Sequence, residues 1–191
     1  MNSAFSFNQY LLKRQVFALA GKFRVYEPGG KLVLFSEQKM FKIREDIRVY
    51  SDESKTQEVL MIKARQIMDF SAAYDVVDSA TGQKVGALRR KGLASILRDE
   101  WEVLDVSDNV VGKLFEDSMG LALVRRFLSN LIPQNYDITF GTNRVADLKQ
   151  PFNPFSYQLN IDFSMDINKV LDRRLGIAAG ILLAAVEGRQ Q

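Results

Sequence analysis

The sequence predicts a mainly β protein: a closed antiparallel β-barrel of roughly ten to twelve strands around a central hydrophobic helix near the C-terminus. Three observations lead to this fold class. Strand–turn–strand units recur along the chain, their number exceeds what a strongly twisted open sheet holds comfortably, and the last apolar segment is too short to cross a bilayer. With 47% hydrophobic and 26% charged residues the balance is ordinary for a globular protein, so we expect a single domain over residues 1–191.

Four segments share an aromatic or apolar residue, a β-branched residue two positions later, and then a polar turn. They begin at Phe23, Ile47, Tyr74 and Trp101, and a looser fifth copy begins at Tyr136. Three units also repeat a Val-Gly/Ala-x-Leu pattern in their second half, at residues 85–88, 111–114 and 145–148. Because the turns are rich in Asp and Gly, each unit is predicted to be a strand, a tight turn and a second strand.

Side-chain alternation predicts which face of each strand points inward. Residues two apart on a strand share a face, so the first residue of each repeat and the β-branched residue after it are expected in the core. These pairs are Phe23 with Val25, Ile47 with Val49, Tyr74 with Val76, and Trp101 with Val103. Gly86 and Gly112 are typical of a close backbone approach or a barrel bend. Further alternating stretches at 40–43 and 93–97 bring the total to roughly ten to twelve strands, and closure removes their free edges.

A predicted amphipathic helix at about residues 118–133 interrupts the strand pattern between the fourth and fifth repeats. Its apolar face has helical spacing, with Leu121, Val124, Leu128 and Leu131. Arg125 and Arg126 lie on the polar face, and Pro133 ends the helix. The helix either packs on the barrel rim or docks on a membrane surface or a protein partner.

The end of the chain alternates strongly from residue 155 to 165 and then becomes helical. Asp166 or Asn168 is expected to cap a helix that runs from about residue 167 to 188. No residue from Leu175 to Val186 is charged, and the segment is apolar on all sides, so it is buried in a protein core or in a membrane.

The length of this apolar segment decides between the two surroundings. Twelve helical residues span about 18 Å, well short of a hydrocarbon core of about 30 Å and close to the length of a barrel strand. We therefore expect the helix inside the barrel, where its small residues admit large side chains from the wall; a membrane-crossing helix and an exposed partner helix are the alternatives. The small residues are Gly176, Ala179, Gly180 and Ala184. The predicted core residues are Leu175, Ile177, Ile181, Leu182, Leu183 and Val186.

Histidine and cysteine are both absent from the sequence. Their absence excludes Ser-His-Asp and Cys-His catalysis, Cys/His zinc sites and disulfides. There is also no Walker motif, paired glycine-rich nucleotide fingerprint or metal-binding cluster. We expect no enzyme activity and no cofactor. A net charge of +3 is too small to indicate a nucleic-acid partner, and the first residues lack a signal-peptide pattern, so the expected location is the cytoplasm, with peripheral membrane association.

The order of these parts resembles a known family. The stretches that carry the resemblance are Lys22-Phe-Arg-Val-Tyr with Gly30-Lys, Tyr74-Asp-Val-Val-Asp with Gly82-Gln-Lys-Val-Gly, and the closing run from Ile161 to Ala184. They are similar to LURP-one-related proteins and to phospholipid scramblases, which share the Tubby C-terminal-like fold. The resemblance covers about residues 8–188. It implies a barrel of about twelve strands around a C-terminal helix, no enzyme chemistry, and, by analogy with Tubby-like members, phosphoinositide binding through surface basic residues.

The resemblance and the basic clusters together predict contact with anionic phospholipid or phosphoinositide. The candidate residues are Arg89, Arg90, Lys91, Arg125 and Arg126. Since neighbouring strand residues point to opposite faces, at most two of the first three share one patch, and a solvated strand edge is the alternative for all three. Arg173 and Arg174 are expected to extend to the barrel mouth.

The sequence is also compatible with other functions. Asp162 and Asp166 are weak calcium candidates, with a solvent-facing strand residue and a helix cap as the alternatives. The chain departs from scramblases because it has no cysteine to palmitoylate and a reduced acidic segment. A soluble protein-interaction barrel, docking through residues 118–133, and a membrane-inserted scramblase are the alternative functions. The oligomeric state is not predicted.

Overall fold

The computed structural model describes residues 2–15, 20–39, 46–65, 72–91, 100–116, 134–153 and 156–187. The strands within these ranges are β1 (Gln9–Gln15), β2 (Ala20–Tyr26), β3 (Leu32–Lys39), β4 (Ile47–Tyr50), β5 (Glu58–Ala64), β6 (Ala73–Asp78), β7 (Lys84–Arg90), β8 (Glu100–Leu104), β9 (Val110–Glu116), β10 (Asn135–Phe140), β11 (Asn143–Lys149) and β12 (Ser156–Asp162). The helices are a 3-10 turn η1 (Ser3–Phe5) and the α-helix α2 (Arg173–Glu187).

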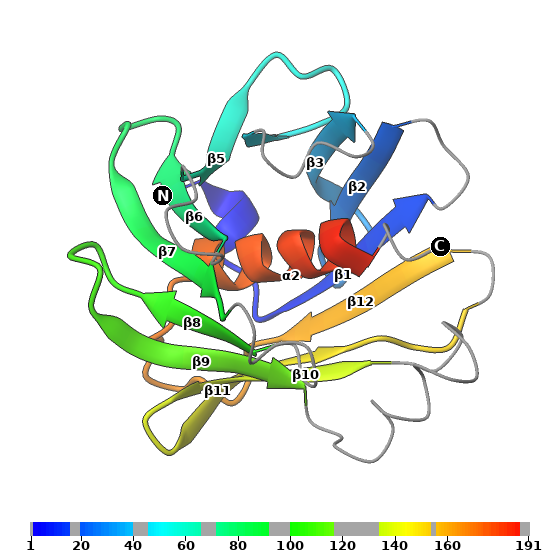
Figure 1. Cartoon of the computed structure of the whole chain (residues 1–191). Helices are drawn as coiled ribbons and strands as arrows, with labels where there is room; N and C mark the ends of the chain where they lie inside the picture. Colours follow the sequence, from blue (N-terminus) through cyan, green and yellow to red (C-terminus); the bar gives the residue numbers. More distant parts are fainter. Residues whose placement is uncertain are drawn as a thin grey trace.

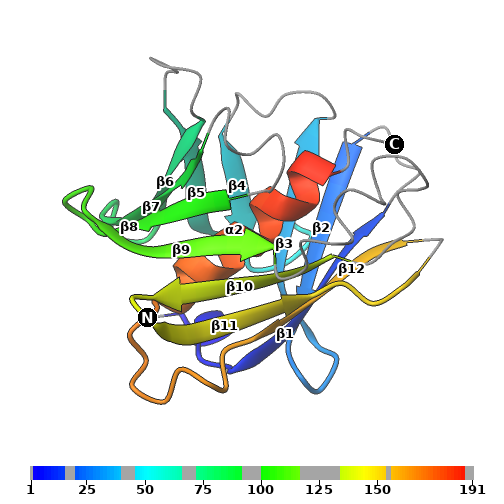
Figure 2. The same ribbon diagram turned by 60° about the horizontal axis from the view of Figure 1, so that its bottom comes forward.

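All twelve strands belong to one closed antiparallel barrel, which confirms the predicted fold class. Each strand pairs with its neighbour in sequence, and β12 returns to pair with β1, from Gln9 opposite Asp162 to Gln15 opposite Ser156. Closure leaves none of the twelve described strands at a sheet edge. Figures 1 and 2 show, from two directions, α2 lying inside the ring of strands.

The five predicted repeats are five hairpins, β2–β3, β4–β5, β6–β7, β8–β9 and β10–β11. The four predicted inward pairs are all buried, and Trp101 is only 2% exposed. The two repeat glycines are explained by close contacts. A Cβ on Gly86 would lie 2.5 Å from the carbonyl oxygen of Leu104 on β8, and one on Gly112 would collide with the ring of Phe140 on β10. The predicted stretches 40–43, 93–97 and 118–133 fall outside the described residues.

The barrel core contains α2, as the length of its apolar segment predicts. The predicted core residues Leu175, Ile177, Ile181, Leu182 and Leu183 are all buried, and the side chain of Val186 falls outside the described part. Large side chains of the barrel wall pack against the small residues of α2, as expected. A Cβ on Gly176 would collide with the ring of Phe163, and one on Gly180 would lie 2.7 Å from Cδ1 of Ile161.

The start of the helix differs from the prediction. The helix begins at Arg173 rather than near residue 167, because Asp172 caps it and accepts a hydrogen bond of 2.9 Å from the backbone N–H of Arg174. Asp166 and Asn168, the two predicted caps, both lie before the helix and do not cap it. The Asp166 carboxylate instead accepts from the backbone N–H groups of Val170 and Leu171 and closes a turn before the helix. The preceding strand also ends earlier than residue 165, at Asp162.

Charged groups hold α2 at both ends. At its N-terminal end the Arg173 guanidinium is buried, lies 2.7 Å from Asp166 and stacks 4.6 Å from the centre of the Phe163 ring. Arg173 therefore does not extend into solvent at the mouth, because Asp166 binds it inside. Arg174 pairs with Asp78 of β6 at 2.6 Å. At the other end buried Arg14 of β1 donates to the carbonyl oxygen of Ala184 at 3.0 Å, where a cation complements the helix dipole.

Gly176→Ala tests the fit between α2 and the wall. Alanine is about 1 kcal/mol better than glycine inside a helix, but the added Cβ would collide with Phe163, and overpacking a core costs about 1–3 kcal/mol. We expect Gly176→Ala to lower the free energy of unfolding measured in urea, and Phe163→Leu combined with it to cost less than the two single changes summed. Gly180→Ala is the matched comparison, since the one close contact of its Cβ is with the flexible end of Ile161; an equal loss there would contradict the explanation.

Asp166→Asn tests the buried ion pair. Removal of one partner of a buried pair leaves the other charge uncompensated and typically costs about 3–5 kcal/mol, and Arg173 is only 7% exposed. We expect a loss of that size in the free energy of unfolding, measured by urea denaturation. The control is Asp52→Asn, which removes an exposed turn carboxylate and should cost about 1 kcal/mol or less. Equal losses in the two variants would rule out a special role for the pair.

Candidate functional site

A cleft of about 440 Å³ opens on the outer surface of the barrel, over β1, β2, β12 and the turn that joins β2 to β3. It is lined by Gln9, Tyr10, Leu11, Lys13, Tyr26, Glu27, Pro28, Gly30, Asn160, Ile161 and Asp162. The register of the barrel brings these residues together, since β1 lies between β12 and β2 and pairs with both. The cleft therefore depends on the strand pair that closes the barrel.

Lys13 is the cation of this cleft. Its side chain is exposed, and its Nζ lies 5.3 Å from the centre of the Tyr26 ring. Its cross-strand neighbours are Gln158 on β12 and Arg24 on β2, neither of which is acidic. Arg24 is itself paired with Glu53 at 2.6 Å. Within the described part of the chain no carboxylate forms an ion pair with Lys13, so its charge is available to a ligand.

Two carboxylates border the cleft in fixed positions. Asp162 accepts from the Ser164 backbone N–H at 2.7 Å and from Nε2 of Gln9 at 2.9 Å. Burial raises the pKa of Asp162, but these hydrogen bonds outweigh it and hold the pKa below its ordinary value. The Glu27 carboxylate accepts from the backbone N–H groups of Gly29 and Lys31, and these bonds lower its pKa. Both groups are charged at neutral pH.

Tyr10 forms the buried side of the cleft. Its hydroxyl donates to the carbonyl oxygen of Ala4 at 3.0 Å and accepts from the Phe7 backbone N–H at 3.1 Å. Burial raises the pKa of Tyr10 to about 12, so the phenol is neutral at physiological pH. Tyr10 thus ties the N-terminal segment to β1 and supplies no charge to the cleft.

The predicted basic cluster on β7 lies on a different part of the barrel wall. Arg89 is directly opposite Glu102 of β8, and Nη2 of Arg89 lies 2.5 Å from the Glu102 carboxylate. Lys91 pairs with Glu100 at 2.8 Å. Arg90 is half-buried opposite Trp101. Arg89 and Lys91 each form an ion pair with a glutamate of β8, and these pairs largely cancel the positive charge of the two side chains.

The remaining predicted residues are placed apart from one another. Arg125 and Arg126, with the whole of 118–133, fall outside the described residues, so a protein partner at that helix stays a prediction. Asp162 borders the outer cleft, whereas Asp166 is buried in the mouth and bound to Arg173. Within the described ranges no three His, Cys, Asp or Glu side chains are arranged to hold a metal ion.

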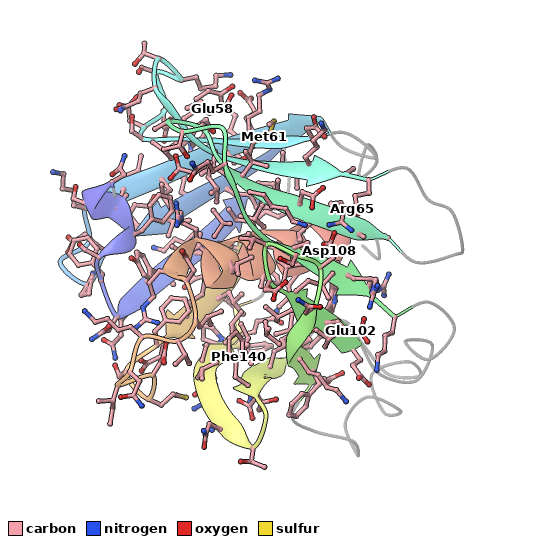
Figure 3. The ribbon with its side chains drawn as sticks, turned by 90° about the vertical axis from the view of Figure 1, so that its left-hand side faces the viewer. Glu58, Met61, Arg65, Glu102, Asp108 and Phe140 are labelled. Atoms are coloured by element: carbon pink, nitrogen blue, oxygen red, sulfur yellow. The ribbon has the colours of Figure 1, made fainter. Side chains whose placement is uncertain are left out.

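A second charged group on the wall is structural. Arg65, which follows β5, binds both Asp75 of β6 and Asp108 of the β8–β9 turn, and Lys84 of β7 also reaches Asp108 at 2.7 Å. Figure 3 shows Arg65 and Asp108 side by side. Two cations face two carboxylates, so the group pins the β8–β9 turn and leaves no net charge for a ligand.

The cleft was not anticipated from the sequence. Lys13 and Asp162 are far apart in the chain, and no motif connects them; only the β1–β12 register does. The alternation on the final strand predicted an outward position for Asp162, but it pointed to no other residue of the cleft.

Among the described residues no helix is long and apolar enough to span a bilayer.

Comparison with known proteins agrees with this architecture. The LURP-one-related family model matches residues 32–184. A crystal structure of an Arabidopsis thaliana protein is similar with a TM-score of 0.50 and 11% sequence identity, covering 96% of this chain and 92% of that chain, which shows a shared fold. No curated protein matched the sequence. The matched region runs from β3 to within α2 and takes in most of the barrel, and the chain belongs to the LURP-one-related family.

Proposed function

We propose that this barrel is a non-enzymatic module that binds the headgroup of an anionic phospholipid, such as phosphatidylserine or phosphatidylinositol, in the cleft over β1, β2 and β12. The observation that carries the proposal is the exposed Lys13, which has no ion-pair partner in the described part of the chain and lies beside the Tyr26 ring. A phosphate needs a cation that is free to pair with it. Membership of the LURP-one-related family supports a barrel module of this kind.

Electrostatics favour the cleft over the basic cluster on β7. A ligand phosphate at Arg89 or Lys91 would have to compete with Glu102 and Glu100, which already lie within ion-pair distance. Among the described residues no carboxylate forms an ion pair with Lys13 that a phosphate would have to displace. Lys13 is therefore a better contact for a lipid phosphate than Arg89 or Lys91.

The composition of the cleft also suggests which headgroups fit. Lys13 supplies one positive charge for one phosphate, and Asp162 and Glu27 supply acceptors for hydroxyl or ammonium donors. Two carboxylates near one lysine repel additional phosphates. A headgroup with one phosphate and several donors, such as serine or unphosphorylated inositol, fits better than a polyphosphorylated inositol. Since anionic lipids are abundant in the cytoplasmic leaflet, the proposal places the protein at that surface as a peripheral component.

Co-sedimentation with anionic vesicles tests the proposal. A basic residue near an anionic membrane contributes about 1 kcal/mol, so reversal of its charge in Lys13→Glu should weaken binding by about tenfold or more. Binding of the unaltered chain should weaken as salt is raised, because the attraction is screened. Binding that is absent, or that does not respond to salt, would overturn the lipid proposal.

Two matched variants separate the cleft from a general charge effect. Lys63→Glu changes the net charge equally, at an exposed lysine of β5 that makes no ion pair in the described part of the chain. Arg89→Gln removes a cation that Glu102 already neutralises. Both should bind vesicles nearly as well as the unaltered chain. If Lys63→Glu loses as much binding as Lys13→Glu, the net charge and not the cleft is responsible.

A further inference from the structure

We infer that the loop between β12 and α2, residues 163–172 and here called the mouth loop, inserts aliphatic side chains into the bilayer at which the cleft binds its headgroup. The inference rests on the proposed function and adds a second, apolar contact to it. Ile167 is 87% exposed and Val170 is 54% exposed. Side chains this apolar gain from leaving water, and a bilayer is the surface that would receive them.

The exposure of these residues is built into the loop. The Asp166 carboxylate accepts from the backbone N–H of Val170 at 2.9 Å and is held in turn by Arg173. Lys169 has a φ of 51° and its backbone N–H donates to the carbonyl oxygen of Asp166 at 3.0 Å. Because the backbone is tied to the buried ion pair, Ile167 and Val170 are held outward by the fold itself.

The charges of the mouth loop suit an anionic membrane. Its two carboxylates both form ion pairs within the chain, the buried Asp166 with Arg173 and the partly exposed Asp172 with Arg174. Lys169 is exposed between the two aliphatic residues. An exposed cation flanked by apolar side chains matches the boundary between lipid headgroups and acyl chains.

The apolar residues gather at one end of the barrel. Six large hydrophobic residues of the described chain are exposed. Five of them belong to the mouth loop or to the β8–β9 turn and the start of β9, which the meander topology places at the same end: Val106, Val110, Val111, Ile167 and Val170. They come from two separate connections of the described chain. This arrangement fits a bilayer, which accepts several separate loops at once, better than one protein ligand.

The cleft opens at the same end. Asp162, which borders it, is the last residue of β12, and the Ser164 backbone N–H of the mouth loop donates to its carboxylate. The β2–β3 turn that forms another side of the cleft also lies at this end. Figure 1 shows the connection from β12 into α2 at the end of the barrel where the helix begins. A headgroup in the cleft and an inserted mouth loop can therefore meet the same membrane.

A fluorescence experiment tests insertion directly. The chain has no cysteine, so Ile167→Cys can be labelled at one position with a dye whose emission shifts to shorter wavelength in apolar surroundings. With phosphatidylcholine vesicles that contain about 20 mol% phosphatidylserine, we expect this shift at position 167. The same dye on Lys63→Cys, on the outer wall of β5, should not shift. No shift at 167 when the protein is vesicle-bound would overturn the inference.

Binding measurements distinguish failure of the insertion from failure of the cleft. Ile167→Asp with Val170→Asp should weaken vesicle binding at least about tenfold, while calorimetric binding of glycerophosphoserine or glycerophosphoinositol, which have no acyl chains, should be unchanged. Lys13→Glu should weaken both vesicle binding and binding of the soluble headgroups. If the double variant still binds vesicles as well as the unaltered chain, the insertion is overturned and the headgroup cleft is not. If the soluble headgroups fail to bind while the dye at position 167 still shifts, the headgroup cleft is overturned and the insertion is not. Both aliphatic residues are exposed, so the urea midpoint should stay the same and confirm that the variant folds.

Discussion

The fit between α2 and the inner wall is the constraint on which the rest of the structure depends. A helix with no charge along its centre can stay out of water only if the strands close around it, and they close only where the helix is narrow. Gly176 and Gly180 provide that space for Phe163 and Ile161. Arg173 with Asp166 at one end and Arg14 with the Ala184 carbonyl at the other hold the helix along its axis. Since the helix fills the described interior, recognition is left to the outer surface and the mouth.

On that outer surface, strand register decides which charges are available. Basic residues adjacent in the sequence suggest a patch, yet antiparallel pairing places Arg89 opposite Glu102 and makes an ion pair of them. Lys13 has a basic neighbour in the sequence, Arg14, but Arg14 is buried and donates to the carbonyl oxygen of Ala184. The neighbours of Lys13 across β12 and β2 are Gln158 and Arg24. Basic clusters in the sequence therefore overestimate the positive charge available on the wall of β7 and do not reveal the one available on β1. The electrostatic field at a sheet surface is set by neighbours across strands as much as by neighbours along them.

The parts that could be predicted from the sequence are those fixed by local pattern. The hairpins follow from alternation and turn residues, which act within about ten positions, and the helix placement follows from the length of an uncharged run. The cleft could not be predicted in this way, since Gln9 and Asp162 are hydrogen-bonded across 153 positions of the chain. The prediction that Asp166 caps the helix was wrong for a related reason. A carboxylate just before a helix looks like a cap, and only the folded mouth shows that it binds a buried arginine while Asp172 caps the helix.

The stretch from Asp162 to Arg174 joins the core to the proposed membrane contact. Asp162 borders the cleft, Asp166 holds the Arg173 guanidinium at the start of α2, and the same carboxylate fixes the backbone that presents Val170. A mouth loop anchored in this way cannot fold its aliphatic residues back into the barrel without giving up a buried ion pair. The exposure of Ile167 is therefore a consequence of how the helix is held, and a surface suited to lipid arises from the same contacts that stabilise the core.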